Sequence, residues 1–359
     1  MQEIDIAPEA FGPLYPYIIN HKITDIDYNG EDLWIVTTDN RRCKVETTKA
    51  GITREFLEQF TSRIASMVSR NFNQVDNVLE AETKELRITM IHESVALTGR
   101  AFCIRKSLPK VRFTGYEAIE HGYCSKEVLE LLVNCVLARM NFVFCGEPAA
   151  GKTECAKFLS QYIPANEKVI TIEDNPEWHY RKINPGKDSV ELKINSRMDY
   201  TKAIKTCLRF NPDWIMLSEA RSVEVKSLLE CWSTGIKGFT TLHTDDARKI
   251  PDRMLNMMEN RLDAERLEND IYNFVDVGIL LRKKVQGKDD KLVRRIDQVC
   301  FFYRSYDANH TMMAVRDGRL KEMVLPQEVM FRFEQAGIME PFVCQKVEQQ
   351  LQKRIFFGR

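Results

Sequence analysis

The segment at residues 146–153, with the sequence GEPAAGKT, fits the pattern GxxxxGK[ST] and constrains the fold more than any other part of the chain. A short apolar run at 141–145 leads directly into it, and the residues after it favour a helix. This order of buried strand, glycine loop and helix is typical of P-loop proteins, in which successive backbone N–H groups face phosphate oxygens. The alternative, an incidental glycine turn, is disfavoured by that context. The sequence therefore predicts a site for ATP or a close relative, together with Mg²⁺.

Each residue type in this loop has an expected task. The glycines let the backbone curl, the Lys152 ammonium reaches the β- and γ-phosphates, and the Thr153 hydroxyl binds Mg²⁺. We expect a helix to begin at Thr153 and to add the positive end of its dipole. The residues expected to contact the nucleotide are Gly146, Glu147, Pro148, Ala149, Ala150, Gly151, Lys152, Thr153 and Cys155.

The residues around the loop alternate between helical and strand-like patterns. An apolar-periodic helix is expected at 126–139, and further strands at 168–173, 213–218 and 237–243, with helical stretches between them. This alternation predicts a largely parallel sheet covered by helices, so the fold class is α/β. Beyond 276 we expect antiparallel strands at 277–282 and 296–303 on either side of a charged turn that starts at Gly287, and then two closing helices.

Residues 1–106 predict a separate α+β domain. Turn signals flank an apolar stretch at 33–36, and Thr53 is a plausible N-cap for a helix with one apolar face. Strand-like segments follow at 86–91 and 101–105. We expect a linker or hinge at 107–118 and an ATPase domain at 119–359.

Composition excludes several other classes of protein. Lysine plus arginine equals aspartate plus glutamate at 52 each, so no overall basic field predicts nucleic-acid binding, although a local basic patch stays open. The ten cysteines lie singly, which favours buried reduced thiols over disulfides or a zinc site. No signal peptide is expected at the N-terminus, and no apolar run approaches the roughly 20 residues that span a bilayer. We therefore expect a soluble, cytoplasmic chain.

Polar residues stand at the ends of three expected strands, where a parallel sheet presents side chains to a bound phosphate. Glu219 is placed to orient or deprotonate an attacking water, and Glu173 and Glu177 to position Mg²⁺ and its waters. His243 is placed to sense the γ-phosphate or to bond Glu219. Thr153, Glu173 and Glu219 are thus the candidate Mg²⁺ residues, largely through water. The alternatives are a surface glutamate, a solvated acidic turn and a structural histidine.

These motifs occur in a recognisable order: the P-loop, TIED at 171–174, LRFNPD at 208–213 with EAR at 219–221, and TTLH at 240–243. In this order they resemble the secretion or traffic ATPases of type II and type IV secretion systems, over residues 23 to 305. The four-cysteine zinc motif of the type II secretion and type IV pilus assembly branch is absent from the sequence. The chain is therefore most similar to the type IV secretion and tight-adherence (Tad) pilus branch.

The resemblance implies a RecA-like motor domain joined to the N-terminal α+β domain, with nucleotide held where the two meet. It also implies a homo-hexamer that passes mechanical work to inner-membrane components of a secretion or pilus machine at the cytoplasmic face of the membrane. Direct nucleic-acid binding is not expected. Hinge closure of one domain on the other would follow ATP binding and release.

The resemblance assigns roles residue by residue. Lys152 and Thr153 become the phosphate and Mg²⁺ residues, Glu173 and Glu177 the acidic box, Glu219 the catalytic glutamate and His243 the histidine box. Arg87 and Arg105 match arginines that reach the nucleotide from the first domain, and salt bridging on a strand face is their alternative. Arg209 and Arg221 match arginines that bridge subunits or domains.

The sequence departs from the family pattern in four places. Ser218 replaces the glycine before the catalytic glutamate, and Asn211 replaces a second arginine. Ala149 and Ala150 replace a Gly/Ser-rich loop interior, and residues 85–86 replace an Asp-Gly pair. Two other functions stay open: a RecA-like DNA translocase or helicase, which would need a basic, aromatic-lined channel, and a nucleotide-sensing scaffold with little turnover.

Overall fold

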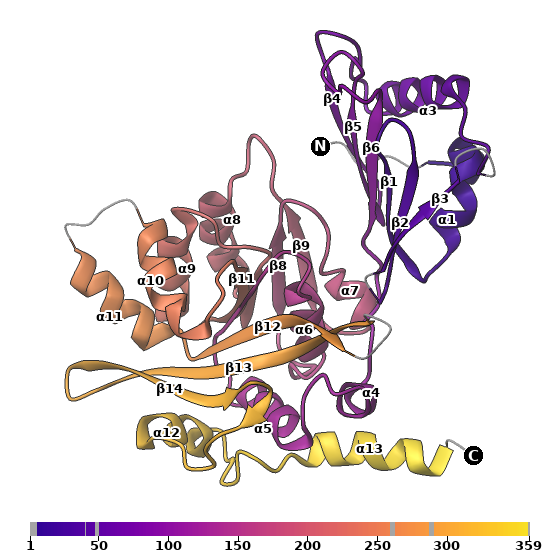
Figure 1. Ribbon diagram of the computed structural model, residues 1–359. Helices are drawn as coiled ribbons and strands as arrows, with labels where there is room; N and C mark the ends of the chain where they lie inside the picture. The colour runs from indigo at the N-terminus through magenta and orange to yellow at the C-terminus, as the bar shows by residue number, and fades with distance from the viewer. Residues whose placement is uncertain (1–5, 40, 47–49, 259–262, 287–290, 358–359) are drawn as a thin grey trace. The chain divides into compact units, whose positions relative to one another are not determined.

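The computed structural model describes residues 6–39, 41–46, 50–258, 263–286 and 291–357 (Figure 1). The chain divides into two compact units. The first comprises Met1–Leu108 with Val285–Leu292, and the second comprises Pro109–Lys284 with Val293–Arg359.

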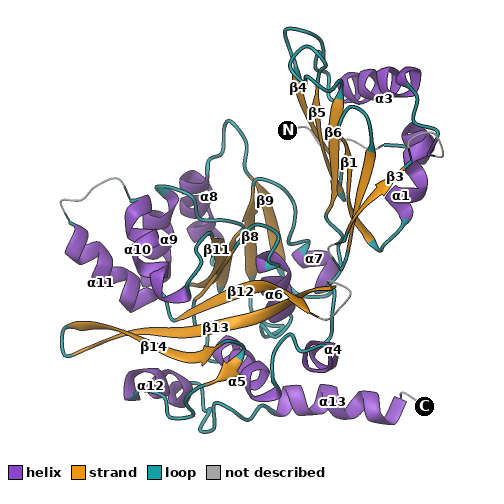
Figure 2. Ribbon diagram, viewed as in Figure 1, coloured by secondary structure: helices purple, strands orange, loops and turns teal. Residues whose placement is uncertain are grey.

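The first unit is built on a six-stranded antiparallel sheet with the order β3-β2-β1-β6-β5-β4 (Figure 2). The helix α3 supplies the apolar side chains that cover it, through Leu57, Phe60 and Ile64. The Thr53 side chain accepts a hydrogen bond from the Phe56 amide, which confirms the expected N-cap. The elements are η1 (Pro8–Leu14), α1 (Tyr15–Ile19), β1 (Ile23–Tyr28), β2 (Leu33–Thr37), β3 (Arg42–Val45), α3 (Arg54–Met67), β4 (Val78–Glu82), β5 (Leu86–Ile91) and β6 (Ala101–Lys106).

The second unit is built on a nine-stranded sheet with the order β15-β14-β13-β12-β7-β11-β10-β8-β9. The run from β12 to β9 is parallel throughout, which confirms the predicted α/β class. The strands are β7 (Phe142–Gly146), β8 (Val169–Glu173), β9 (Ser189–Lys193), β10 (Trp214–Leu217), β11 (Lys237–Leu242), β12 (Val277–Gln286), β13 (Lys291–Ser305), β14 (Ala308–Arg316) and β15 (Arg319–Leu320).

Helices cover both faces of this sheet, and side chains alternate between two separate cores. Phe142 and Phe144 of β7 belong to one core, whereas Val143 and Cys145 belong to the other. The first core is closed by α5 (Lys126–Leu137), α6 (Lys152–Ser160), α12 (Gln327–Gln335) and α13 (Gln345–Phe357), and the second by α8 (Tyr200–Cys207), α9 (Glu224–Ser233), α10 (Ile250–Met257) and α11 (Ala264–Phe274) (Figure 1). Because β7 is buried on both faces, it reads as an apolar run with no polar alternation.

The structure differs from the sequence prediction after residue 276. The strand β12 pairs in parallel with β7, so it extends the central sheet instead of only starting an antiparallel pair. The next strand, β13, runs back beside β12, where the Phe302 amide donates a hydrogen bond to Asp276 O. On its other side, β13 pairs antiparallel with β14. The strands β9, β14 and β15 were not expected from the sequence, and residues 287–290 of the expected turn lie outside the described residues. The two expected closing helices, α12 and α13, are confirmed.

The ten cysteines are all free thiols, and eight of them are buried. Cys43 on β3 is exposed and Cys103 on β6 is half-buried. The expected burial is therefore confirmed for eight of the ten. Within the described residues, no helix has the length and apolar character required to cross a bilayer.

Candidate functional site

The parallel register brings the predicted site residues to one edge of the sheet. Leu217 of β10 pairs with Ile172 of β8 and with Thr240 of β11, and Leu242 of β11 pairs with Cys145 of β7. The carboxyl ends of parallel strands meet at the same edge. The P-loop, the acidic segment at 173–177, Glu219 and His243 follow these strand ends and are therefore neighbours in space.

The P-loop has the backbone that its glycines permit. Gly146 has φ 143°, and a Cβ there would lie 2.4 Å from Leu281 O on β12. Gly151 has φ 95° and is the N-cap of α6, so the helix begins at Lys152, one residue before the predicted start. Ala149 also adopts a left-handed conformation, with φ 58°. An alanine in this region costs about 1–2 kcal/mol relative to right-handed backbone, so surrounding contacts must hold it there.

The first turn of α6 presents backbone N–H groups to the loop. The first four N–H groups of a helix have no partner within the helix, and they carry the positive end of its dipole. This is the arrangement that binds a phosphate group.

The Lys152 ammonium lies over the loop. Its Nζ is 3.1 Å from Gly146 O, 3.4 Å from Glu147 O and 3.3 Å from Nδ1 of His243. Burial lowers the pKa of Lys152, and the carboxylate of Glu219 acts in the opposite direction. The ammonium group thus faces three neutral acceptors, namely two loop carbonyls and a ring nitrogen of His243. A bound phosphate oxygen would replace them as its partner.

His243 connects Lys152 to Glu219. Its Nε2 lies 3.1 Å from Oε1 of Glu219, while Nδ1 faces Lys152. Burial, followed by the charge of Lys152, lowers the pKa of His243, which favours the neutral ring. A neutral ring that donates from Nε2 and accepts at Nδ1 satisfies both neighbours. The structure therefore places His243 in contact with Glu219. This contact is one of the two roles that the sequence predicted for His243.

Arg221 holds the other oxygen of Glu219. Its Nε and a terminal nitrogen lie 2.9 and 2.7 Å from Oε2, and its second terminal nitrogen lies 2.7 Å from Asp174. A two-point contact between a guanidinium and a carboxylate fixes the orientation of both groups. Sequence reasoning had placed Arg221 at a domain or subunit contact and had not seen that it bonds the proposed catalytic carboxylate.

The acidic segment divides into two tasks. The Thr153 hydroxyl donates to Glu177 Oε2 at 3.2 Å, so these two oxygens are adjacent. Glu173 is buried instead, and its Oε2 accepts from the amides of Glu177 and Trp178 at 2.7 and 2.9 Å. Burial raises the pKa of Glu173 to about 8. Glu173 therefore shapes the turn that carries Glu177.

The donor atoms fit Mg²⁺ bound mainly by water and phosphate. Hydroxyl and carboxylate oxygens are the ligands that Mg²⁺ prefers, and it usually retains several waters. Thr153 and Glu177 supply such oxygens at the loop. Within the part of the chain that the structure describes, no three His, Cys, Asp or Glu side chains converge on one point. Of the predicted Mg²⁺ residues, Thr153 faces Glu177, Glu219 faces His243 and Arg221, and Glu173 points inward.

Two departures from the family pattern have local explanations. The Ser218 hydroxyl lies 3.2 Å from the Tyr200 hydroxyl, so the extra side chain is accommodated by a partner on α8. Asn211 has φ 50°, a left-handed conformation that asparagine tolerates better than arginine.

For the remaining predicted residues, the structure shows other contacts than the expected ones. Cys155 is fully buried in the core, and its amide donates to Gly151 O within α6, so the structure gives it no atom on the open side of the loop. In the first unit, Arg87 lies 3.7 Å from Glu80 and Arg105 Nε lies 2.9 Å from Asp25 Oδ1. Both arginines therefore make salt bridges between strands. Such salt bridges were the alternative to the predicted role of reaching the nucleotide.

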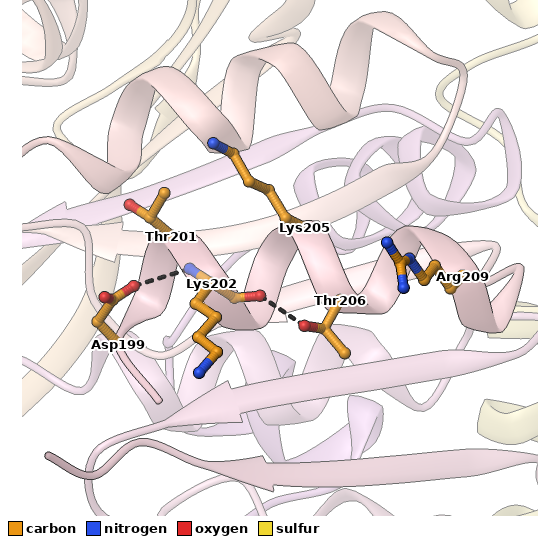
Figure 3. A pocket seen from close by; sticks show the side chains of 6 residues that line it. All are labelled: Asp199, Thr201, Lys202, Lys205, Thr206 and Arg209. Atoms are coloured by element: carbon orange, nitrogen blue, oxygen red, sulfur yellow. Dashed lines mark hydrogen bonds between the residues drawn. The ribbon is translucent and has the colours of Figure 1, made fainter. Parts of the chain in front are cut away.

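Arg209 lies on the η2 turn (Leu208–Phe210), at one end of a shallow hollow along α8 (Figure 3). No P-loop residue lines this hollow. The Asp199 side chain accepts from the Lys202 amide at 2.7 Å, which is an N-cap contact. The lining residues are Asp199, Thr201, Lys202, Lys205, Thr206 and Arg209, and they form a charged, solvated helix face.

Sequence reasoning missed two cations beside the P-loop. Lys283 Nζ donates to Pro148 O at 2.9 Å, and Arg294 Nε donates to Ala149 O at 3.0 Å. Both lie on strands β12 and β13, more than 130 residues after the loop. The only sequence signal for them is the basic composition of those strands, which is common at solvent-exposed sheet ends.

A protein-family model described as "Type II/IV secretion system protein" matches this chain over residues 8–354. The chain belongs to this family. The match confirms the predicted resemblance to secretion ATPases and implies a nucleotide-binding protein. The finer branch within the family is not decided by it.

Two curated relatives show the extent of similarity. An uncharacterized protein of Bacillus anthracis, pXO2-25, is 26% identical over 279 residues, covering 77% of this chain and 63% of the relative. The type IV secretion system protein VirB11 of Bartonella quintana is 29% identical over 192 residues, covering 49% of this chain and 53% of the relative. The chain thus spans about half to two thirds of the length of these relatives.

One solved structure gives the fold. The ATPase DotB of Yersinia pseudotuberculosis has a TM-score of 0.63, with 16% sequence identity, 85% of this chain covered and 83% of that chain. The second unit accordingly has the RecA-like motor fold that was predicted.

Proposed function

We propose that this chain hydrolyses ATP and uses the energy to drive a type IV secretion, conjugation or Tad-type pilus assembly machine. The observation that carries the proposal is the continuous series of contacts from Lys152 through His243 to Glu219. It joins the group expected to hold the terminal phosphate to the group expected to act on water.

Glu219 is the proposed general base. Its carboxylate is held at both oxygens, by His243 and by Arg221, so it presents a fixed face to a water at the strand end. Lys152 releases its loop carbonyls and neutralises the phosphate charge that develops in the transition state. Mg²⁺, when bound, would neutralise further charge on the phosphate oxygens. Thr153 would hold it directly and Glu177 through water.

The wider organisation is proposed from the family. It comprises a homo-hexamer, the domains at 1–106 and 119–359 with a hinge at 107–118, and work delivered to inner-membrane components at the cytoplasmic face of the membrane. In this scheme Arg87 and Arg105 leave Glu80 and Asp25 and neutralise phosphate charge during turnover. Alanine substitution of either arginine should then reduce turnover and leave nucleotide binding measurable.

The central experiment compares wild type with Lys152→Ala and Glu219→Gln. Phosphate release and equilibrium binding of ATP are measured for each, and the native mass is measured with and without ATP. Glu219→Gln is expected to bind ATP and to lose turnover by roughly 100-fold or more, because a positioned base contributes about that much. Lys152→Ala is expected to lose both.

Other outcomes discriminate among the functions. Equal hydrolysis by all three proteins would refute the assigned mechanism. Binding without turnover in the wild type would favour a nucleotide-sensing scaffold. Salt-dependent binding of single-stranded DNA would favour a translocase. A chain that stays monomeric with ATP would refute the ring and leave the P-loop assignment intact.

A further inference from the structure

The P-loop carbonyl groups are held by positive side chains, two of which lie outside the loop. Four consecutive carbonyl oxygens, those of residues 146 to 149, each lie within 3.4 Å of a cationic nitrogen. Lys152 accounts for the first two. Lys283 and Arg294, which no predicted role includes, account for the carbonyls of Pro148 and Ala149.

The sheet register explains why these two side chains reach the loop. On β12, Leu281 pairs with Gly146 of β7, so the residues after Leu281 run beside the loop itself. Lys283 also approaches the Glu147 carboxylate at 3.7 Å. On the adjacent strand, Arg294 lies across the loop: its Cδ is 3.2 Å from the position that a Cβ on Gly151 would occupy.

The direction of each peptide group gives these contacts a consequence. In a trans peptide, the carbonyl of one residue and the N–H of the next point to opposite sides. Cations that hold the Pro148 and Ala149 carbonyls therefore fix the planes of two successive peptides around Ala149, the alanine in the left-handed region. A loop with glycine at this position would need less support, because glycine adopts positive φ without a steric cost.

We propose that Lys283 and Arg294 are positioning residues that hold the P-loop in its phosphate-binding conformation. They act through the carbonyls of Pro148 and Ala149. Their contacts offset the steric cost of positive φ at Ala149. The strands β12 and β13 that carry them are in this way part of the nucleotide site. This proposal rests on the proposed function, because it assumes that the loop binds a nucleotide.

Equilibrium binding of a fluorescent ADP analogue tests the proposal. The full chain is used in wild-type form and as Lys283→Met, Arg294→Met and the conservative Arg294→Lys. Lys284→Met is the matched control, because Lys284 is exposed, neighbours Lys283 and makes no contact with the loop among the described residues. Melting temperatures are recorded for every variant to confirm that each is folded.

Arg294→Met and Lys283→Met should each weaken binding by about tenfold or more, since each loses a charge-assisted hydrogen bond to the loop. Arg294→Lys should recover part of the loss, and Lys284→Met should stay within about twofold of wild type, because it keeps every loop contact. Under saturating ATP, the kcat of the positioning variants should fall less than their nucleotide affinity, because Glu219 and His243 are unchanged.

The decisive variant is Ala149→Gly combined with Arg294→Met. Glycine removes the cost of positive φ at residue 149, so it should restore most of the affinity lost in Arg294→Met. No restoration would show that Arg294 acts by its charge on the nucleotide, and would overturn the proposal. Wild-type affinity in both Met variants would also overturn it. If wild type itself fails to bind nucleotide, the proposed function fails and this inference fails with it.

Discussion

Glu173 offers the sharpest test of the site's electrostatics, through the substitution Glu173→Gln. Burial raises the pKa of its carboxyl to about 8 in the native chain, whereas an exposed glutamate in the unfolded chain has its ordinary pKa of 4.5. The native state therefore binds the proton more tightly, and its stability is greatest below pH 4.5 and falls as the pH rises towards 8. Glutamine is neutral at every pH and removes this dependence.

The size of the effect follows from linkage. Between the two pKa values, the free energy of unfolding falls by about 1.4 kcal/mol per pH unit for one such group. From pH 5.5 to 7.5, the variant should therefore gain about 2 to 3 kcal/mol relative to wild type. The glutamine carbonyl still accepts from the amides of Glu177 and Trp178, so at pH 5.5 the two proteins should differ by no more than about 1 kcal/mol.

Urea unfolding followed by tryptophan fluorescence measures this difference, with EDTA present to exclude divalent cations. Trp178 lies directly beside the substituted residue and is fully buried, so its emission reports opening of this segment. The control is Glu177→Gln, because Glu177 is a neighbouring glutamate that is only half-buried, whereas Glu173 is buried. Free energies of wild type and Glu173→Gln that change in parallel with pH would refute the assignment of a proton to native Glu173.

Three further predictions concern the sheet and its edge. Gly238→Ala should lower the melting temperature by about 5 °C or more, since the new Cβ would lie 2.2 Å from Ile215 O on the neighbouring strand; an unchanged value would contradict this packing. Glu177→Gln should raise the Mg²⁺ concentration needed for half-maximal hydrolysis, and an unchanged Mg²⁺ requirement would remove Glu177 from the metal site. The kcat should stay level as the pH falls through 6.5 and decline only below it, because burial and Lys152 lower the pKa of His243; a decline centred above 6.5 would contradict a neutral ring.

The sequence predicted the parts of the site that depend on local pattern. The P-loop is recognisable from eight consecutive residues, Glu173 ends a short apolar strand, and Glu219 and His243 each follow one. Because parallel strands deliver their ends to one edge, the predicted parallel sheet was enough to expect these groups together. The contact between His243 and Glu219 was among the roles considered, and the structure shows it at 3.1 Å.

What the sequence did not predict depends on pairing between distant segments. The placement of β12 beside β7 is a long-range choice, and only this pairing brings Lys283 and Arg294 to the loop. The burial of Glu173 was missed for a different reason, because its carboxylate was expected to position Mg²⁺ and its waters or to lie in a solvated turn. Its inward direction is set by the amides of the following turn. Likewise, β9 was missed because its side chains are only half-covered and its pattern is weak.

The distribution of thiols makes the first unit chemically addressable. Cys43 is exposed, whereas burial raises the pKa of Cys103 to about 12 and keeps that sulfur protonated at neutral pH. The eight remaining cysteines are buried. Since the thiolate is the form that reacts with a maleimide, a brief treatment of the native protein should attach one dye, at Cys43 on β3. The unmodified sequence thus carries a built-in labelling position for optical measurements on the first unit during turnover.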